Sequence, residues 1–537
     1  MTGLWEMVRL IFRRDRMKLP LFFGGFVAVF LLMIPMMRDV YGEPESLATM
    51  YATLGVNPAA RFMVGPMDGP TLGALVMVKL LLWFGMALAF INTIFVVRHT
   101  RHNEEIGAQE LLLSGPMRRG SGLAAALLVA FVVNAFVVTT LGVGMHYMEV
   151  SWDVEESWLF AVAIGVFGFV WAAIAGVVVQ LVENGRSANG ILALLIGVTF
   201  VLRGVGDFLA TLGDDGLYYP MWMSTLSPFG WMQATRPLTH PDWAPLWISI
   251  GSAIVAMAIG FILLAQRDVG AGLLPSRKGR ARASRLLATP LGLTWRLQRG
   301  VFIAWLAAII VIVVTIGALV PQMTDVLSDS DSMRAMIEAI GGVGEMVPTF
   351  MSAMMAIVCL MVFGYVLHGL TKLRGEEVSG RLENIVATRV TRLQWLTLHV
   401  AVVLIGGMLM LAATGGILAL CVNLLSDFTI DVDEYMLASL SYAPVMLVFA
   451  ALYLLLFGAF SGLASGVSWL YFGFVAFALW LGPVVGLDQA IMNLSVMEYV
   501  ASPPAEAISW GVLGNIGTVA IGMGVVGIVA FRRRNIG

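Results

Sequence analysis

Long apolar stretches are the feature that most restricts how this chain folds. Twelve of them follow one another along 537 residues, of which 59% are hydrophobic. A helix of about 20 apolar residues crosses the ~30 Å hydrocarbon core of a bilayer and satisfies its own backbone polar groups. We therefore predict an all-α integral membrane protein with about twelve transmembrane helices. The expected spans are 19–37, 72–97, 122–146, 157–181, 188–207, 246–265, 301–320, 348–370, 395–421, 440–462, 467–487 and 508–531.

The positive charges predict the orientation of these spans. If the N-terminus is cytoplasmic, 26 of the 32 Lys and Arg residues fall on inner segments and four on outer segments. Such an excess on one side follows the positive-inside rule. We expect a multi-pass protein of the plasma (inner) membrane with both termini in the cytoplasm. Residues 1–18 are basic and no cleavage site follows the first span, which predicts an uncleaved signal-anchor.

The two halves of the chain resemble each other weakly but in order. IPMMRDV (34–40) matches VPQMTDV (320–326), DVEE (153–156) matches DVDE (431–434), and GFILLAQRDVG (260–270) matches GIVAFRRRNIG (527–537). A unit of six spans enters the membrane twice in the same orientation, which predicts two halves related by a pseudo-two-fold axis along the membrane normal. We expect a first six-helix half at 1–270, a basic cytoplasmic linker with an interfacial helix at 271–300, and a second half at 301–537. The linker is a solvated loop, or it contacts anionic lipid headgroups or a partner.

Two charged segments, one in each half, follow the second span of that half. EE-x-G-A-Q-E (104–110) aligns with EE-x-x-G-R-L-E (376–383) if one residue is gapped. In the second copy we expect an i,i+4 ion pair between Glu377 and Arg381 and an apolar stripe beginning at Leu382. Each segment is either a short amphipathic helix that docks into a partner or an ordinary interfacial helix. The candidate contact residues are Glu104, Glu105, Gln109, Glu110 and Arg118 in the first copy, and Glu376, Glu377, Arg381, Glu383 and Arg389 in the second.

The loop at 376–389 and the segment RDVGAGLLP (267–275) resemble permeases of the ABC-2 class. The similarity is to actinobacterial exporters of drugs and polyketide antibiotics, the tetronasin-resistance type. It implies that 104–116 and 376–389 are coupling helices seated on two copies of a separate P-loop ATPase. It also implies interfacial helices at Leu4–Arg16 and Leu291–Arg299. The first copy departs from the pattern at Ala108 and Gln109, so its docking site need not equal the second.

The chain lacks the means to hydrolyse ATP. No G-x-x-x-x-G-K-[ST] sequence occurs, and no soluble stretch approaches the size of a nucleotide-binding domain. We therefore expect no cofactor in this chain and no enzymatic activity of its own. ATP and Mg²⁺ are expected in the partner ATPase. The other expected partners are membrane lipids and a small lipophilic substrate, and no nucleic acid.

A few polar side chains fall within the predicted spans. An ammonium near the bilayer centre costs ~2.5–3.5 kcal/mol, so Lys79 is expected to snorkel outward or to line the interface between the halves. Arg203 and Asp207 are spaced i,i+4 and are expected to pair as a structural clasp at the outer leaflet. Helix-to-helix hydrogen bonds are the favoured roles of Asn92, Asn134, Gln180 and His368, with pathway lining as the alternative.

Two outer segments cannot be full spans. Residues 216–243 are aromatic and broken by proline, and residues 488–507 occupy the matching place in the second half. Irregular backbone at membrane depth requires protein or a water-filled cavity around it. We expect both segments to be re-entrant or lid-like helices that cap the interface between the halves. An aromatic belt at the membrane surface is the alternative role of Trp222, Trp231 and Trp243.

The leading hypothesis is the transmembrane subunit of an exporter driven by a separate ATPase, and the resemblance implies hydrophobic drugs or polyketide-type antibiotics as substrates. An ion-coupled 6+6 secondary transporter is the alternative, although it would need titratable carboxylates near mid-bilayer, and Asp207 and Asp488 lie at outer ends. A third hypothesis is a lipid-linked transferase that uses outer carboxylates such as Asp153, Asp214 and Asp215. No His/Asp/Glu cluster with metal-ligand spacing favours it.

Overall fold

The chain forms two compact helical units, Met1–Gly279 and Arg280–Gly537, each with its own hydrophobic core. The computed structural model describes residues 3–55, 58–115, 117–148, 152–274, 284, 285, 287, 289–328, 343–425, 429–485 and 488–534. Twelve helices of this described part are long and apolar enough to cross a membrane. The predicted fold class, all-helical with twelve spans, is therefore confirmed.

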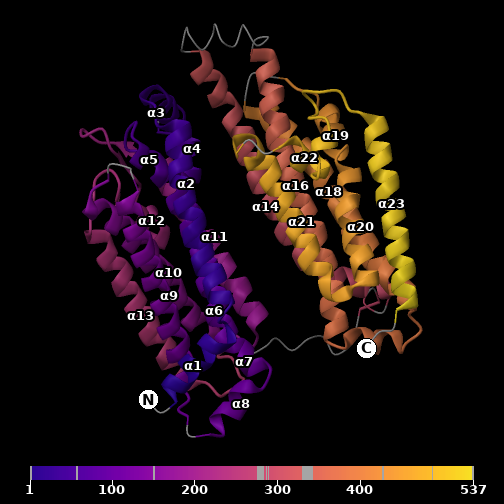
Figure 1. Cartoon of the computed structure of the whole chain (residues 1–537), viewed down its shortest axis with the longest axis horizontal. Coiled ribbons are helices and arrows are strands. Elements are labelled where there is room, and N and C mark those ends of the chain that lie inside the picture. Colours follow the sequence, from indigo (N-terminus) through magenta and orange to yellow (C-terminus); the bar gives the residue numbers. More distant parts are fainter. Residues whose placement is uncertain are drawn as a thin grey trace. The chain divides into compact units, whose positions relative to one another are not determined.

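The first unit is a bundle of long helices with short helices at both ends (Figure 1). The loop helices α7 and α8 lie at the end that holds the N-terminus, and α3 lies at the opposite end. A π-helical turn at Pro20–Gly24 begins the first span, and another at Met77–Leu81 interrupts the second. A third π-helical turn, Tyr51–Gly55, follows α3 directly, and the two-residue strands β1 and β2 pair antiparallel. The elements are α1 (Leu4–Arg14), α2 (Gly25–Tyr41), α3 (Pro44–Met50), α4 (Pro58–Val64), α5 (Leu72–Val76), α6 (Leu82–His99), α7 (Arg101–Glu105), α8 (Ala108–Leu113), α9 (Ser121–Tyr147), α10 (Val154–Leu181), α11 (Gly185–Phe208), β1 (Thr211–Leu212), β2 (Tyr218–Tyr219), α12 (Pro228–Ala234) and α13 (Ala244–Gln266).

The second unit is also a bundle of long helices, and its C-terminus lies at the end opposite to α19 and α22 (Figure 1). Its second span is the most enclosed, because 72% of the apolar window of Phe350–Val378 is buried. The described elements are α14 (Pro290–Ser328), α16 (Val343–Val378), α17 (Arg381–Val386), α18 (Arg392–Leu425), α19 (Val432–Leu440), α20 (Ala443–Ala459), α21 (Ser461–Val485), α22 (Gln489–Met492) and α23 (Trp510–Arg533).

The two predicted interfacial helices have different outcomes. α1 is a separate helix that ends at Arg14, where the buried Asp15 pairs with Arg98 at 2.9 Å and with His99 at 2.7 Å. The chain can turn there because α6 supplies partners for the Asp15 carboxylate. The predicted separate helix Leu291–Arg299 is wrong, since these residues are the first turns of the continuous helix α14. Residues 275–283, 286 and 288 of the predicted linker 271–300 lie outside the described residues.

Neither of the two proline-broken segments between the spans is a full span, as predicted, whereas their expected place over the interface between the halves stays a prediction. Residues 216–243 contain β2, one 3-10 turn at Ser224–Leu226 and α12, and residues 488–507 contain α22 and one 3-10 turn at Val496–Tyr499. None of these elements is long enough to cross a bilayer. The short helices α3 and α4, between the first two spans, had no periodic signal in the sequence and were not predicted.

In each unit, the last span packs on the fourth through glycine. A Cβ on Gly260 of α13 would lie 3.2 Å from the backbone of Gly176 in α10. A Cβ on Gly527 of α23 would lie 2.6 Å from the backbone of Leu454 in α20, and one on Gly458 would collide with the carbonyl oxygen of Gly527. Small residues allow two membrane helices to approach closely and to make many dispersion contacts. These contacts stabilise helix association in lipid, where the hydrophobic effect does not favour it.

Polar side chains inside the spans are engaged with neighbouring helices. Asn92 of α6 and Asn134 of α9 exchange two hydrogen bonds, at 3.2 and 2.7 Å, so the helix-to-helix prediction is confirmed for this pair. His368 accepts from Trp305 Nε1 at 3.2 Å. Lys79 Nζ donates to Tyr41 OH at 3.3 Å and lies 4.5 Å from the centre of the Tyr41 ring. The ring and hydroxyl of Tyr41 thus reduce the cost of placing this ammonium in the span.

Candidate functional site

The two charged loops have the same backbone construction. In the first unit, α7 ends at Glu105, Gly107 adopts φ 72°, and the six-residue helix α8 follows. In the second unit, α16 ends at Val378, Gly380 adopts φ 70°, and the six-residue helix α17 follows. Glycine is suited to both positions because a Cβ would strain the left-handed conformation that ends the first helix and redirects the chain.

This construction corrects the alignment of the loops. The sequence was aligned with a one-residue gap that matched Glu104 with Glu376, yet the two left-handed glycines match without a gap. Both loops then follow the spacing R-x2-E-x2-G-x2-E-x8-R. The gapped alignment is therefore wrong, and the correct pairs are Arg101 with Arg374, Glu104 with Glu377, Gly107 with Gly380, Glu110 with Glu383, and Arg119 with Arg392.

Glu104 is directed into the first unit. Its carboxylate accepts from Arg101 at 2.6 Å and from Arg267 Nη1 at 2.8 Å. The three side chains are only 9%, 0% and 3% exposed, respectively. Arg101 also donates to the carbonyl of Val179 in the last turn of α10, and Arg267 donates to the Gln180 side chain. Carbonyl groups at a helix C-terminus carry partial negative charge, which offsets the surplus positive charge of two arginines.

Glu377 makes the corresponding contacts in the second unit. Its carboxylate accepts from Arg374 at 3.3 Å and from Arg534. Arg534 also donates to the carbonyl of Phe457 in the last turn of α20, at 2.9 Å. The three side chains are more accessible than those of the first unit, with Arg374 33%, Glu377 10% and Arg534 18% exposed. We call the sets Arg101–Glu104–Arg267 and Arg374–Glu377–Arg534 the first and second triad.

The predicted ion pair between Glu377 and Arg381 is wrong. Arg381 instead binds Glu376 through two hydrogen bonds of 2.9 Å. Gly380 interrupts the helix between positions 377 and 381, so these residues do not share a helix face. The apolar stripe lies on the core of its own unit, with Leu382 fully buried and Ile385 and Val386 partly buried. It is therefore not a free membrane-facing surface.

Two further candidates of the first loop also contact their own unit. Glu105 accepts from the backbone N–H of Gly185 at 2.7 Å, where a carboxylate is stabilised by the N-terminus of α11. Gln109 is buried beside Gly122 at the start of α9. In contrast, the exposed side chains that are available to a partner are Glu110, Arg118, Arg381, Glu383 and Arg389, whereas Glu376, the ion-pair partner of Arg381, is only 13% exposed. The two loops also have the exposed apolar side chains Leu111 and Val378, which are 78% and 69% exposed.

Arg203 and Asp207 form the predicted pair, at 3.1 Å and with both side chains 0% exposed. Asp207 also accepts from Gln233 of α12 at 3.0 Å and from Ser224 at 3.3 Å, while Arg203 donates to the carbonyl of Met63 in α4 at 3.3 Å. The pair therefore joins α11 to α4 and α12, which fits the predicted clasp, and its location at the outer leaflet stays a prediction. Nearby, burial raises the pKa of Asp68, and this rise is opposed by Arg236 at 3.4 Å.

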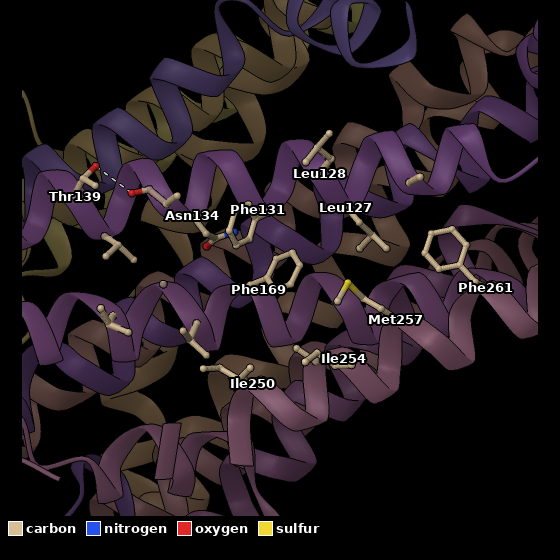
Figure 2. Close-up of a pocket in the computed structure, with 17 residues that line it drawn as sticks. Leu127, Leu128, Phe131, Asn134, Thr139, Phe169, Ile250, Ile254, Met257 and Phe261 are labelled. Carbon is tan, nitrogen blue, oxygen red and sulfur yellow. Dashed lines mark hydrogen bonds between the residues drawn. The ribbon is translucent and has the colours of Figure 1, made fainter. Parts of the chain in front are cut away.

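A long apolar groove of about 780 Å³ runs between α9, α10 and α13 of the first unit. Figure 2 shows Thr139 towards one end, Phe261 towards the other, and Phe131 and Phe169 between them. Of the described residues that line it, two have polar side chains. Asn134 is bonded to Asn92, and Thr139 Oγ1 donates to the carbonyl of Ala135 at 3.0 Å. The groove therefore suits an apolar molecule and offers no charged group to a headgroup.

Comparison with known proteins places the chain in a transporter family. The family model described as "Multidrug efflux system permease Rv1217c, C-terminal domain" matches residues 4–264 and 287–532. The chain belongs to this family. The multidrug efflux system permease protein Rv1217c of Mycobacterium tuberculosis (strain ATCC 25618 / H37Rv) is 29% identical over 549 residues, which cover 100% of this chain and 95% of that relative. The expected similarity to drug-export permeases is confirmed at the level of the Rv1217c permease family.

Proposed function

We propose that this chain is the membrane-spanning subunit of an exporter of the ABC-2 class. In this proposal it moves small lipophilic compounds, of the drug or polyketide-antibiotic kind, out of the cell. Two copies of a separate P-loop ATPase bind and hydrolyse ATP with Mg²⁺. Membership of the Rv1217c family, whose described relative is named a multidrug efflux permease, supports the export of such compounds.

The repeated loop construction is the observation that carries the proposal. Each loop ends a long span, turns at a left-handed glycine, and presents an exposed carboxylate on a six-residue helix, Glu110 on α8 and Glu383 on α17. Each loop also has an exposed apolar side chain, which is Leu111 next to Glu110 in the sequence and Val378 before Gly380 in the second loop. A mixed apolar and acidic projection suits a groove in a water-soluble partner better than it suits the hydrocarbon of a bilayer. Two such projections correspond to two ATPase copies.

The charge distribution supports a cytoplasmic location for both loops. With the N-terminus inside, the inner segments carry 26 of the 32 basic residues, and both loops and both termini fall on that side. The ATPase must be cytoplasmic to reach ATP, so the loops lie where the proposed contact requires them. The apolar groove between α9, α10 and α13 supports a lipophilic substrate class, since ligand sites of about 300–1,000 Å³ are lined mainly by apolar groups.

Charge reversal of the two exposed carboxylates tests the docking. We expect the double variant Glu110→Lys/Glu383→Lys, tagged and purified from its own host membranes, to lose most of the co-purifying ATPase and the ATP hydrolysis stimulated by lipophilic compounds. Like charges juxtaposed across an interface cost several kcal/mol, which is enough to dissociate a transient complex. The measurements are the ratio of ATPase to permease in the purified complex and the rate of ATP hydrolysis.

The matched control is Glu43→Lys/Glu434→Lys, which reverses two exposed carboxylates. Each of them lies at the end of its unit that is opposite to the charged loop (Figure 1). This variant should retain both the ATPase and the stimulated activity. If Glu110→Lys/Glu383→Lys also retains both, the docking assignment is wrong.

Ion coupling is the alternative mechanism. It requires a carboxylate that exchanges protons within a span, but Asp207 is fully engaged by Arg203, Gln233 and Ser224. In vesicles that contain ATP and the ATPase, collapse of the proton gradient should leave transport of a lipophilic dye unchanged. Loss of transport under these conditions would favour the ion-coupled transporter.

A further inference from the structure

The two triads connect three parts of each unit at one place. Glu104 and Arg101 lie on α7, directly before Gly107 and α8, whereas Arg267 directly follows α13. Glu377 and Arg374 lie in the last turns of α16, directly before Gly380 and α17, whereas Arg534 directly follows α23. In both units an arginine of the triad also holds a carbonyl in the last turn of the fourth span, α10 or α20.

A further arginine strengthens the same junction in each unit. Arg119, just before α9, donates to the carbonyl of Arg267, and Arg392, the first residue of α18, donates to the carbonyl of Arg534 at 3.2 Å. The ends of the second, fourth and sixth spans and the start of the third are therefore tied together in each unit. The helix that follows the left-handed glycine leaves from this junction.

The contacts are strong and directional. A carboxylate that bridges two guanidinium groups makes charge-assisted hydrogen bonds, which are shorter and about twice as strong as neutral ones. Partial burial reduces screening by water and salt, and loss of one partner leaves the others with unpaired charge. The segments directly before Gly107 and Gly380, from which α8 and α17 leave, therefore cannot be displaced from the last span of their unit without separating these partly buried charges.

We propose that the two triads are positioning elements that make each docking helix and the last span of its unit move as one body. The inference rests on the proposed function, because it concerns how movement of an ATPase would reach the spans. Glu104 and Glu377 act through Arg267 and Arg534 and do not touch the ATPase. Their role differs from that of Glu110 and Glu383, which face the partner.

The two units differ in how tightly the junction is held. The first triad is almost fully buried, and its Arg267 also donates to the Gln180 side chain. In the second triad, Arg374 and Arg534 are partly accessible. Neutralisation of Glu104 should therefore impair coupling more than neutralisation of Glu377. Coupling through a packed network requires that the connected parts have two discrete arrangements, and the tighter first junction transmits the change more completely.

The test uses the complete complex of this chain with its ATPase, reconstituted in nanodiscs. Glu104→Gln and Glu377→Gln remove the charge but keep the side-chain shape and one oxygen acceptor. We expect both variants to retain the ATPase and its basal hydrolysis, while the ratio of stimulated to basal hydrolysis falls by about fivefold or more, the lower end of typical coupling between sites. Arg534→Gln added to Glu377→Gln should cause little further loss, because the link is already broken. Glu434→Gln, an exposed carboxylate of α19, is the control and should behave as the wild type.

A distance measurement separates positioning from mere stabilisation. In a background with Cys359 and Cys421 replaced, spin labels at Asn384→Cys on α17 and Val529→Cys on α23 report the separation of the two elements. For the wild type, the distance distribution should be the same without nucleotide and with a trapped nucleotide. For Glu377→Gln it should shift or broaden with nucleotide.

Three outcomes decide the matter. If the wild-type complex shows stimulated hydrolysis but the variants match it in coupling and in label distance, the triads are not the link. A nucleotide-dependent distance in the wild type would also overturn the inference, since α17 and α23 would then move separately. If no ATPase accompanies the wild-type chain at all, the proposed function itself fails, and the inference fails with it.

Discussion

Asp207→Ala should strongly destabilise the first unit. The change leaves the guanidinium of Arg203 fully buried without its carboxylate, and it removes the acceptor for Gln233 and Ser224. Breaking a buried ion pair by removing one partner costs about 3–5 kcal/mol, because the remaining charge is uncompensated. Thermal unfolding of the purified chain, followed by tryptophan fluorescence, should show a markedly lower midpoint.

Two further variants make this expectation specific. Asp214→Ala, an exposed carboxylate in the same outer region, should leave the midpoint nearly unchanged. Replacement of both partners, Arg203→Met with Asp207→Leu, should recover much of the loss, because apolar side chains of similar volume do not need a counter-charge. Equal midpoints for Asp207→Ala and Asp214→Ala would show that the clasp contributes little to stability.

Gly458→Ala should destabilise the second unit, although Gly→Ala in a helix usually stabilises it by about 0.5–1 kcal/mol. A Cβ at position 458 of α20 would collide with the backbone of Gly527 in α23, and backbone cannot move aside as a flexible side chain can. Forcing extra volume into a packed contact costs about 1–3 kcal/mol, so the net effect should change sign. The readout is again the midpoint of thermal unfolding.

The control lies on the partner helix. Gly522 of α23 has no atom within 4 Å of the position of an added Cβ, so Gly522→Ala should be neutral or stabilising. If Gly458→Ala and Gly522→Ala have the same effect on the midpoint, the close approach of α20 and α23 is not the reason that position 458 requires glycine. The corresponding contact in the first unit, Gly176 with Gly260, is looser at 3.2 Å and should tolerate alanine better.

The sequence was sufficient for the membrane class and for the position of every span. Apolar length alone decides whether a helix crosses a bilayer, so composition in a window of about 20 residues carries the answer. Apolar composition did not predict where helices end or which short helices lie between the spans. The continuation of α14 through Leu291–Arg299 and the short helices α3 and α4 depend on contacts with the rest of the unit, such as those that hold Asp15 at the end of α1.

The candidate loops were found from their charge, but charge did not say which residues face a partner. Glu104 and Glu105 are adjacent and chemically identical, yet Glu104 bridges two arginines and Glu105 binds the N-terminus of α11. The partner of Glu104, Arg267, lies 163 positions away. The ungapped spacing R-x2-E-x2-G-x2-E-x8-R indicates that Glu104 corresponds to Glu377. An alignment that matches the adjacent glutamates of both loops hides this spacing.

The sequence by itself determined that this protein is a helical membrane protein with two similar charged loops, because hydrophobicity and charge are properties of the residues themselves. Only the tertiary structure decided that Glu104 and Glu377 turn inward while Glu110 and Glu383 remain exposed. The physical reason is that a carboxylate is buried only where distant arginines and helix C-termini compensate its charge, and folding alone brings those groups together.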